Sequence, residues 1–548
     1  MKGLDLVKKN WNWIVLILIL ILGFNLRAYH LDYPVVGYHN WKEVHYLTEA
    51  RNFARDGFFD DGLFMPHSDI PYYDSNPNGI HKDTFPTISI IDGLFFKILG
   101  DQIWVARLIN ILFSLGSIFF FYLLIKKIFK REDLALTAAT VLSILPLFVF
   151  FGRQTQLINP AIFFMLFGSY FYLVWIKKNL IRYSLLFSIG IMLATITKYS
   201  FALIIIPMLV IFPFKKIFKK ENVKKYSKQM IIVILIILLI PTWMVYNSKI
   251  SDQLDGYSDQ GGFFGSSQIN LLFKTEFWTP VKSFVADNYT YMGIILALMG
   301  IILLIFLRKK NKIGSKFFMG YVIGALIWIP IMASKLKGHS YHQYPLLPLI
   351  AFLISLTIVV ISGSASSLIN NKYKKFIKTG LIIIFLIIIF FPAKTAWQRQ
   401  FDTQFIGLDV AGEYIKQNSE INDRVIHSRH QSFGVVWHAD RKGENPPTNL
   451  SVLKKLEKRG ANWIFMYQWG IPKITQNKEV WDYIQNNYGL EQIAFQVSGN
   501  EQQLIYLLLK KGGTFNETTI PEVIKDKPLN EKTYEFSRGH QKMHYINI

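Results

Sequence analysis

Several cations stand in short polar breaks between long apolar stretches of this sequence. They are Arg153, Lys198, Lys335 and Lys337. An ionisable side chain costs about 2.5 to 3.5 kcal/mol at the centre of a membrane helix, so cations beside such stretches require a reason. A lone lysine can simply extend toward lipid headgroups. Several cations at one depth instead suit a lipid-linked phosphate, which carries its charge there.

The turn after Lys337 is rich in polar rings, namely His339, Tyr341, His342 and Tyr344. An aromatic belt at the membrane interface with two incidental histidines is one interpretation. Four polar rings beside two lysines exceed what anchoring requires, so we favour contacts with a donor or an acceptor molecule. The two histidines, three residues apart, could also share a metal ion, but no third ligand is evident.

Two carboxylates between the first and second apolar stretches are candidates for a general base. The candidates are Glu43, supported by Lys42, His45 and Tyr46, and Asp83, supported by Lys82. A solvated amphipathic helix with i,i+4 pairs is the plain alternative for the segment around Glu43. A base must reach the hydroxyl that it deprotonates, and the sequence leaves the choice between Glu43 and Asp83 open.

The elements that must position these residues are apolar helices. The 548-residue chain is 51% hydrophobic and 16% aromatic, with apolar runs too long and too many for a soluble domain to bury. Eleven membrane spans are expected near 12–29, 104–125, 134–151, 158–176, 182–197, 199–214, 230–247, 290–307, 317–334, 344–362 and 377–393. The fifth and sixth are short and share one apolar stretch that breaks at Lys198. We therefore predict a polytopic α-helical membrane protein.

The basic residues indicate how the spans are oriented. Lysines and arginines crowd alternate loops, whereas the short loops of the other face hold only the four cations named above. The pattern predicts a multi-pass protein of the cell membrane with a cytoplasmic N-terminus. The net charge of +23 is explained by these loops and by anionic lipids, which excludes nucleic acid as a partner. The absence of cysteine excludes disulfides and thiolate chemistry.

Two outer loops and a C-terminal region are too long to be simple connections. We expect a transmembrane domain over 1–393, with a first outer loop at 30–103 and a second at 248–289, whose run 259–265 is a candidate lid. Strand-like and helix-like segments alternate after residue 393, so 394–548 should form an extracytoplasmic α/β domain. The polar tail after Lys510 is expected to be partly disordered.

The order of these features resembles the GT-C glycosyltransferases, in particular the family 39 branch of protein O-mannosyltransferases and the lipid A aminoarabinose transferase. The matching motifs are Trp41 to Tyr46 with Ala50, Lys82 to Pro86, Ala106 to Leu108, the Arg153 loop, Thr197-Lys198, His342 to Tyr344 with Pro348, and His438 to Gly443. The resemblance covers most of the chain. Two positions depart from the family pattern. Lys42 occupies the position of the usual catalytic Asp, and Asn159 occupies a position where an Asp is common.

The resemblance implies transfer of a sugar from a polyprenyl-phosphate-linked donor to a lipid, glycan or protein acceptor at the outer face. A phosphate leaving group is already a weak base, so it requires cations rather than a proton donor, and the remaining task is to activate the acceptor. Glu43 or Asp83 would then be the base of an inverting reaction. A divalent ion on the carboxylates would assist, but no ligand set requires it. The alternatives are a transporter or lipid flippase and a non-catalytic scaffold, which Lys42 favours.

Overall fold

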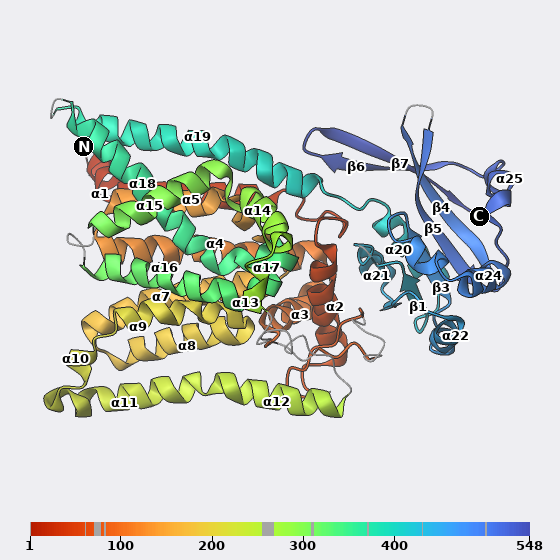
Figure 1. Cartoon of the computed structure of the whole chain (residues 1–548), viewed down its shortest axis with the longest axis horizontal. Helices are drawn as coiled ribbons and strands as arrows, with labels where there is room; N and C mark the ends of the chain where they lie inside the picture. The colour runs from red at the N-terminus through yellow and green to blue at the C-terminus, as the bar shows by residue number, and fades with distance from the viewer. Residues whose placement is uncertain are drawn as a thin grey trace.

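The computed structural model describes residues 2–60, 62–70, 78–81, 84–254, 268–307, 312–369, 372–429, 431–498 and 501–548. Asp83, Lys82 and the candidate lid at 259–265 lie outside the described residues. Figure 1 shows a bundle of roughly parallel helices, a C-terminal domain built around a sheet, and helix α2 (Asn40–Asp56) between them. The N-terminus lies at the end of the bundle that is distant from the C-terminal domain.

The bundle consists of long and short apolar helices that follow the expected spans. They are α1 (Lys2–Ala28), α4 (Ile103–Phe129), α5 (Glu132–Ile144), α6 (Pro146–Phe151), α7 (Ile158–Lys178), α8 (Ile181–Thr197), η1 (Tyr199–Ile204), α9 (Ile205–Val210), α11 (Lys220–Ile237), α12 (Leu239–Gln253), α15 (Tyr291–Leu307), α16 (Lys312–Ile331), η3 (Ser340–Leu346), α18 (Leu347–Ser367) and α19 (Lys374–Asp402). Short elements α10 (Phe214–Ile217), α13 (Gln268–Leu271), α14 (Thr275–Tyr289) and α17 (Ala333–Gly338) connect them.

The count of eleven spans is not confirmed. Within the described residues, seven helices are long and apolar enough to cross a membrane, or eight if the bent pair α14–α15 is one span. The pair α5–α6 is interrupted at Leu145 before Pro146, and α8 and the η1–α9 helix are shorter apolar helices. The chain is nevertheless an integral multi-pass protein, because α11–α12 and α19 leave most of their apolar side chains unburied, as lipid-facing helices do.

The first long loop supplies two helices that stand at the C-terminal-domain end of the bundle (Figure 1). Helix α2 is polar in sequence, yet most of its residues are buried. Helix α3 (Thr87–Leu99) is apolar but has only 13 residues, too few to span hydrocarbon. Its Leu94, Phe95, Ile98 and Leu99 are exposed, as suits a helix that lies along a membrane interface.

The C-terminal domain contains a mixed seven-stranded sheet of order β2-β1-β3-β5-β4-β7-β6. The strands are β1 (Arg424–His427), β2 (Lys442–Glu444), β3 (Trp463–Tyr467), β4 (Tyr488–Ser498), β5 (Glu501–Lys511), β6 (Asn530–Phe536) and β7 (Gly539–Asn547). The helices are α20 (Leu408–Asn418), α21 (Gly434–Ala439), α22 (Leu450–Lys458), α23 (Pro472–Thr475), α24 (Lys478–Asn487), η4 (Glu517–Thr519) and α25 (Ile520–Ile524). Strands β2, β1 and β3 are parallel and the other pairings are antiparallel. The α/β prediction is confirmed.

The prediction of a partly disordered tail after Lys510 is wrong. Residues 530–547 form the hairpin β6–β7, which pairs with β4 and completes the sheet. Strand β6 buries Tyr534, and β7 buries Met543 and Ile546. The low apolar content therefore concealed two strands that bury few side chains, because they are added at the edge of an existing sheet.

One hydrophobic core joins the first loop to the C-terminal domain. It contains Val44 and Leu47 of α2 together with Val435 and Trp437 of α21. A separate core fills the helical bundle, and a third covers the other face of the sheet. Helix α2 is thus fixed between the two parts of the molecule.

Candidate functional site

A cavity of about 300 Å³ lies where the first loop meets the bundle. Its described lining contains three lysines, Lys42, Lys198 and Lys335, and six ring residues, Trp41, Tyr46, Tyr199, His339, Tyr341 and His342. Thr84, Ser200 and Ser334 add hydroxyl groups. No carboxylate lines the cavity within the described part of the chain, so the positive charge around it is suited to an anion.

The three lysines come from three separate elements. Lys42 stands in the first turn of α2, and Lys335 lies on α17. Lys198 has extended backbone between α8 and η1, at the break expected from the sequence. Its Nζ lies 5.3 Å from the centre of the Tyr341 ring, and Lys42 Nζ lies 4.6 Å from that of Trp41. The convergence of three elements on one cavity requires the tertiary fold.

Aromatic rings form one wall of the cavity. The rings of His339 and Tyr341 are nearly parallel, with centroids 5.4 Å apart, and Trp41 lies 5.4 Å from His339. Tyr341 also lies 4.5 Å from His342. Flat rings beside hydroxyl groups can pack against the apolar face of a sugar while the polar atoms bind its hydroxyls.

Three residues that the sequence grouped with these lie elsewhere. Lys337 points to Glu276, with Nζ 3.5 Å from Oε1. Tyr344 is buried, and its hydroxyl donates to Asn159 Oδ1 at 2.7 Å. Arg153 donates to the carbonyl oxygens of Tyr29 and His30, at 2.8 and 2.7 Å, and holds the turn after α1. None of the three lines the cavity in the described structure.

Glu43 is held in a buried ion pair on the side of α2 that packs against α4. Its Oε1 accepts from Arg107 Nε at 2.9 Å, its Oε2 accepts from the same guanidinium at 3.2 Å, and it is 2% exposed. Burial alone would raise the pKa of Glu43, but Arg107 and Arg153 outweigh burial and lower it. Glu43 is therefore ionised and committed to Arg107, and it does not line the cavity.

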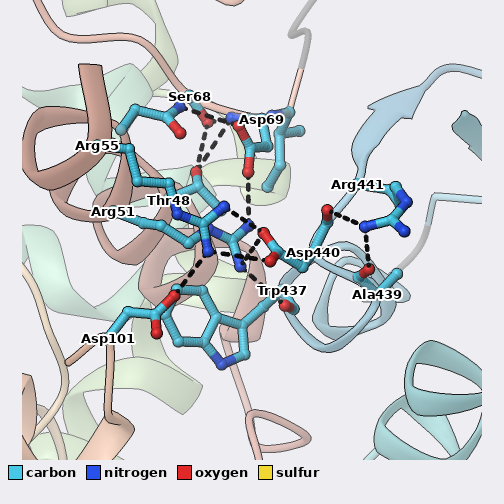
Figure 2. Close-up of polar contacts among 12 residues, drawn as sticks. Thr48, Arg51, Arg55, Ser68, Asp69, Asp101, Trp437, Ala439, Asp440 and Arg441 are labelled. Atoms are coloured by element: carbon cyan, nitrogen blue, oxygen red, sulfur yellow. Dashed lines mark hydrogen bonds and ion pairs between the residues drawn. The ribbon is translucent and has the colours of Figure 1, made fainter. Parts of the chain in front are cut away.

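The C-terminal half of α2 carries a network of ions that reaches the C-terminal domain. Figure 2 shows Arg51 and Arg55 pointing toward Asp440, which lies just after α21. Arg51 lies 3.0 Å from Asp440 and 2.6 Å from Asp69, and Arg55 lies 2.7 Å from Asp440 and 3.0 Å from Asp101. The Arg51 guanidinium also stacks on Trp437 at 4.6 Å. This network fixes the orientation of the helix that carries Lys42 and Tyr46.

His339 and His342, the candidate metal ligands of the cavity, have no third ligand beside them in its described lining. The rings of His339 and His342 are 6.0 Å apart, and the described lining adds no carboxylate to them. The one described group of three potential ligands is His45, Glu49 and His81, behind the cavity wall. The sequence identified His45 but not its two partners. The i,i+4 spacing of His45 and Glu49 was the available signal, whereas the approach of His81 depends on the fold.

This chain resembles known proteins in one segment of its sequence and in its fold. Residues 83–245 match the model of the dolichyl-phosphate-mannose-protein mannosyltransferase family. A search of curated proteins gave no significant match. The fold matches ArnT from Cupriavidus metallidurans bound to undecaprenyl phosphate, at 11% identity and a TM-score of 0.57, over 91% of this chain and 98% of ArnT. The apo state of ArnT gives a TM-score of 0.56.

The arabinofuranosyltransferase AftD from Mycobacteria has the same arrangement at 11% identity and a TM-score of 0.51. That match covers 93% of this chain and 40% of AftD. The fold and the matched segment define the class of protein, a membrane protein with the GT-C glycosyltransferase architecture. The chain thus has the fold of the GT-C glycosyltransferases, as the resemblance in its sequence predicts, and residues 83–245 are similar to one family of them.

Proposed function

We propose that the protein transfers a sugar from a polyprenyl-phosphate-linked donor to an acceptor that is a lipid, a glycan or a protein. The observation that carries the proposal is the convergence of Lys42, Lys198 and Lys335 on one cavity with an aromatic wall. Such a cavity suits a phosphate and an attached sugar. The undecaprenyl phosphate bound to ArnT supports a donor of this class.

In the proposed reaction, the three lysines stabilise the charge that develops on the phosphate as the sugar–phosphate bond breaks. Preorganised cations aimed at developing charge supply a large part of catalysis in sites that exclude water. The rings of Tyr341 and His339 hold the sugar, and attack from the opposite side of the anomeric carbon inverts it. A base then has to accept the proton of the acceptor hydroxyl.

Asp83 is the better candidate for that base. Glu43 gives both carboxylate oxygens to Arg107 and lies outside the cavity lining. Asp83 immediately precedes Thr84, which lines the cavity. Since Asp83 itself is outside the described residues, its role is supported by this position in the sequence and by the commitment of Glu43 elsewhere.

The experiment is the release of polyprenyl phosphate from a panel of polyprenyl-phosphate sugars by protein purified into lipid. We expect turnover by the wild type, a loss of about 100-fold or more in Asp83→Asn, and a clear reduction in Lys198→Ala. Lys274→Ala, which removes an exposed lysine at the start of α14, is the matched control and should retain activity. Folded protein that releases no phosphate from any donor with any acceptor would favour a transporter or a scaffold.

A further inference from the structure

A buried group of three potential metal ligands lies directly behind the cavity wall. His45 and Glu49 are one turn apart on α2, and His81 approaches them from the loop segment 78–81. The three side chains are 0%, 1% and 8% exposed, in that order. The His45 ring lies 4.9 Å from the ring of Tyr46, which lines the cavity.

The distances among the three side chains fit one small cation. Glu49 Oε1 lies 3.1 Å from His45 Nε2 and 3.9 Å from His81 Nδ1, and all the ligating atoms lie within 4.8 Å of one another. Ligands that bind one tetrahedral zinc ion at about 2.0 to 2.1 Å lie about 3.3 Å from each other. Small rotations of the imidazole rings therefore suffice to bring the three atoms to one ion.

A further contact fixes the carboxylate in the orientation that binding requires. Glu49 Oε2 accepts a hydrogen bond of 2.6 Å from the Ser89 hydroxyl on α3. The other oxygen, Oε1, is thereby directed toward the two histidines. Metal-binding carboxylates are commonly held in this way by a hydrogen bond to the oxygen that does not ligate.

The chemistry of the ligand set selects the metal. Two imidazoles and one carboxylate suit zinc, whereas calcium and magnesium prefer sites made of oxygen ligands. Two histidines and a glutamate also leave a fourth position of a zinc tetrahedron for water. Without a metal, the same residues form a buried His–Glu–His contact.

We propose that His45, Glu49 and His81 bind a zinc ion that joins α2 to the segment before Thr84. Helix α2 brings Lys42 and Tyr46 to the cavity, and Thr84, three residues after His81 in the sequence, also lines it. The zinc ion would thus set the spacing between two parts of the cavity wall. This inference concerns metal binding alone and does not depend on the transferase activity.

The test is the metal content of the full-length protein in detergent after exposure to zinc and removal of unbound metal. We expect one zinc per chain in the wild type and a loss of stoichiometric zinc in His81→Asn and in Glu49→Gln. His540→Asn, which changes an exposed histidine of the C-terminal domain, is the matched control and should retain the metal. Cobalt bound to the wild type should show the intense visible absorption of tetrahedral cobalt, and this readout requires no variant to fold.

Two results would overturn the proposal. One is wild-type protein that holds no stoichiometric zinc or cobalt at micromolar free metal. The other is zinc that remains in folded His81→Asn but is lost in His342→Asn, because the metal would then belong to the cavity histidines instead.

Discussion

At the scale of single residues, the role of a charged side chain depends on the residues that it contacts. Lys42 stands where the related family has an Asp, and it adds a third cation to the cavity instead of a base. Glu43, the next residue, faces the other way and pairs with Arg107. Neighbouring residues on a helix project about 100° apart, so adjacent charges can serve different sites.

The pair of Glu43 and Arg107 predicts a loss of stability rather than a specific loss of chemistry in Glu43→Gln. Removal of one partner leaves a buried guanidinium uncompensated, which costs about 3 to 5 kcal/mol. Thermal unfolding of the purified protein measures this cost. An unchanged unfolding temperature together with abolished turnover would contradict the structural role and restore Glu43 as a base.

The same pair predicts how stability depends on pH. The pKa of Glu43 in the folded protein lies below its ordinary value of 4.5. The stabilisation is therefore complete above pH 4.5 and is lost as the pH falls through the lowered pKa. The unfolding temperature of the wild type should fall more steeply below pH 4.5 than that of Glu43→Gln, which has already lost this contribution.

At the scale of elements, α2 connects three separate environments. One part of its surface supplies Lys42 and Tyr46 to the cavity, another buries Glu43 against α4, and a third carries Arg51 and Arg55 to Asp440. A helix most of whose polar side chains are buried in tertiary contacts cannot be recognised as buried from its own hydropathy. From the sequence, a solvated amphipathic helix is the plain alternative for this segment.

Asp440→Asn tests the contact between α2 and the C-terminal domain. The change removes the charge shared by Arg51 and Arg55, so we expect α2 and α21 to open more easily, by about 1 to 3 kcal/mol. Hydrogen exchange of the backbone amides in both helices measures this difference. Glu531→Gln, which breaks the exposed pair with Lys542, is the control and should change exchange little. Equal exchange in all three proteins would show that the network does not fix α2.

Much of the fold and part of the site could be predicted from the sequence. Apolar runs located the helices, and the break at Lys198 and the polar rings near His339 led to residues of one cavity. Arg153, Lys337 and Tyr344 stand in similar local sequence but turn toward other partners. That difference depends on side-chain direction and on contacts with distant elements, which sequence spacing does not determine.

At the scale of the whole molecule, the cavity lies where the first loop meets the helical bundle. Helix α2 of that loop stands between the bundle and the C-terminal domain (Figure 1). The bundle exposes apolar surface suited to lipid, and the sheet domain stands at one end of it. A lipid-linked donor could therefore keep its chain in the membrane while its phosphate enters the cavity. The cytoplasmic N-terminus and extracytoplasmic C-terminal domain inferred from the loop charges stay predictions.

The most direct measurement is the affinity of undecaprenyl phosphate for the protein in lipid nanodiscs. A hydrogen bond to a charged group contributes about 1.5 to 3 kcal/mol, so Lys198→Ala should weaken binding about tenfold or more. Lys42→Ala and Lys335→Ala should weaken it in the same direction, and the Lys274→Ala control should bind as the wild type does. Equal affinity in the wild type and in all three cavity variants would contradict the account of the cavity as a phosphate site.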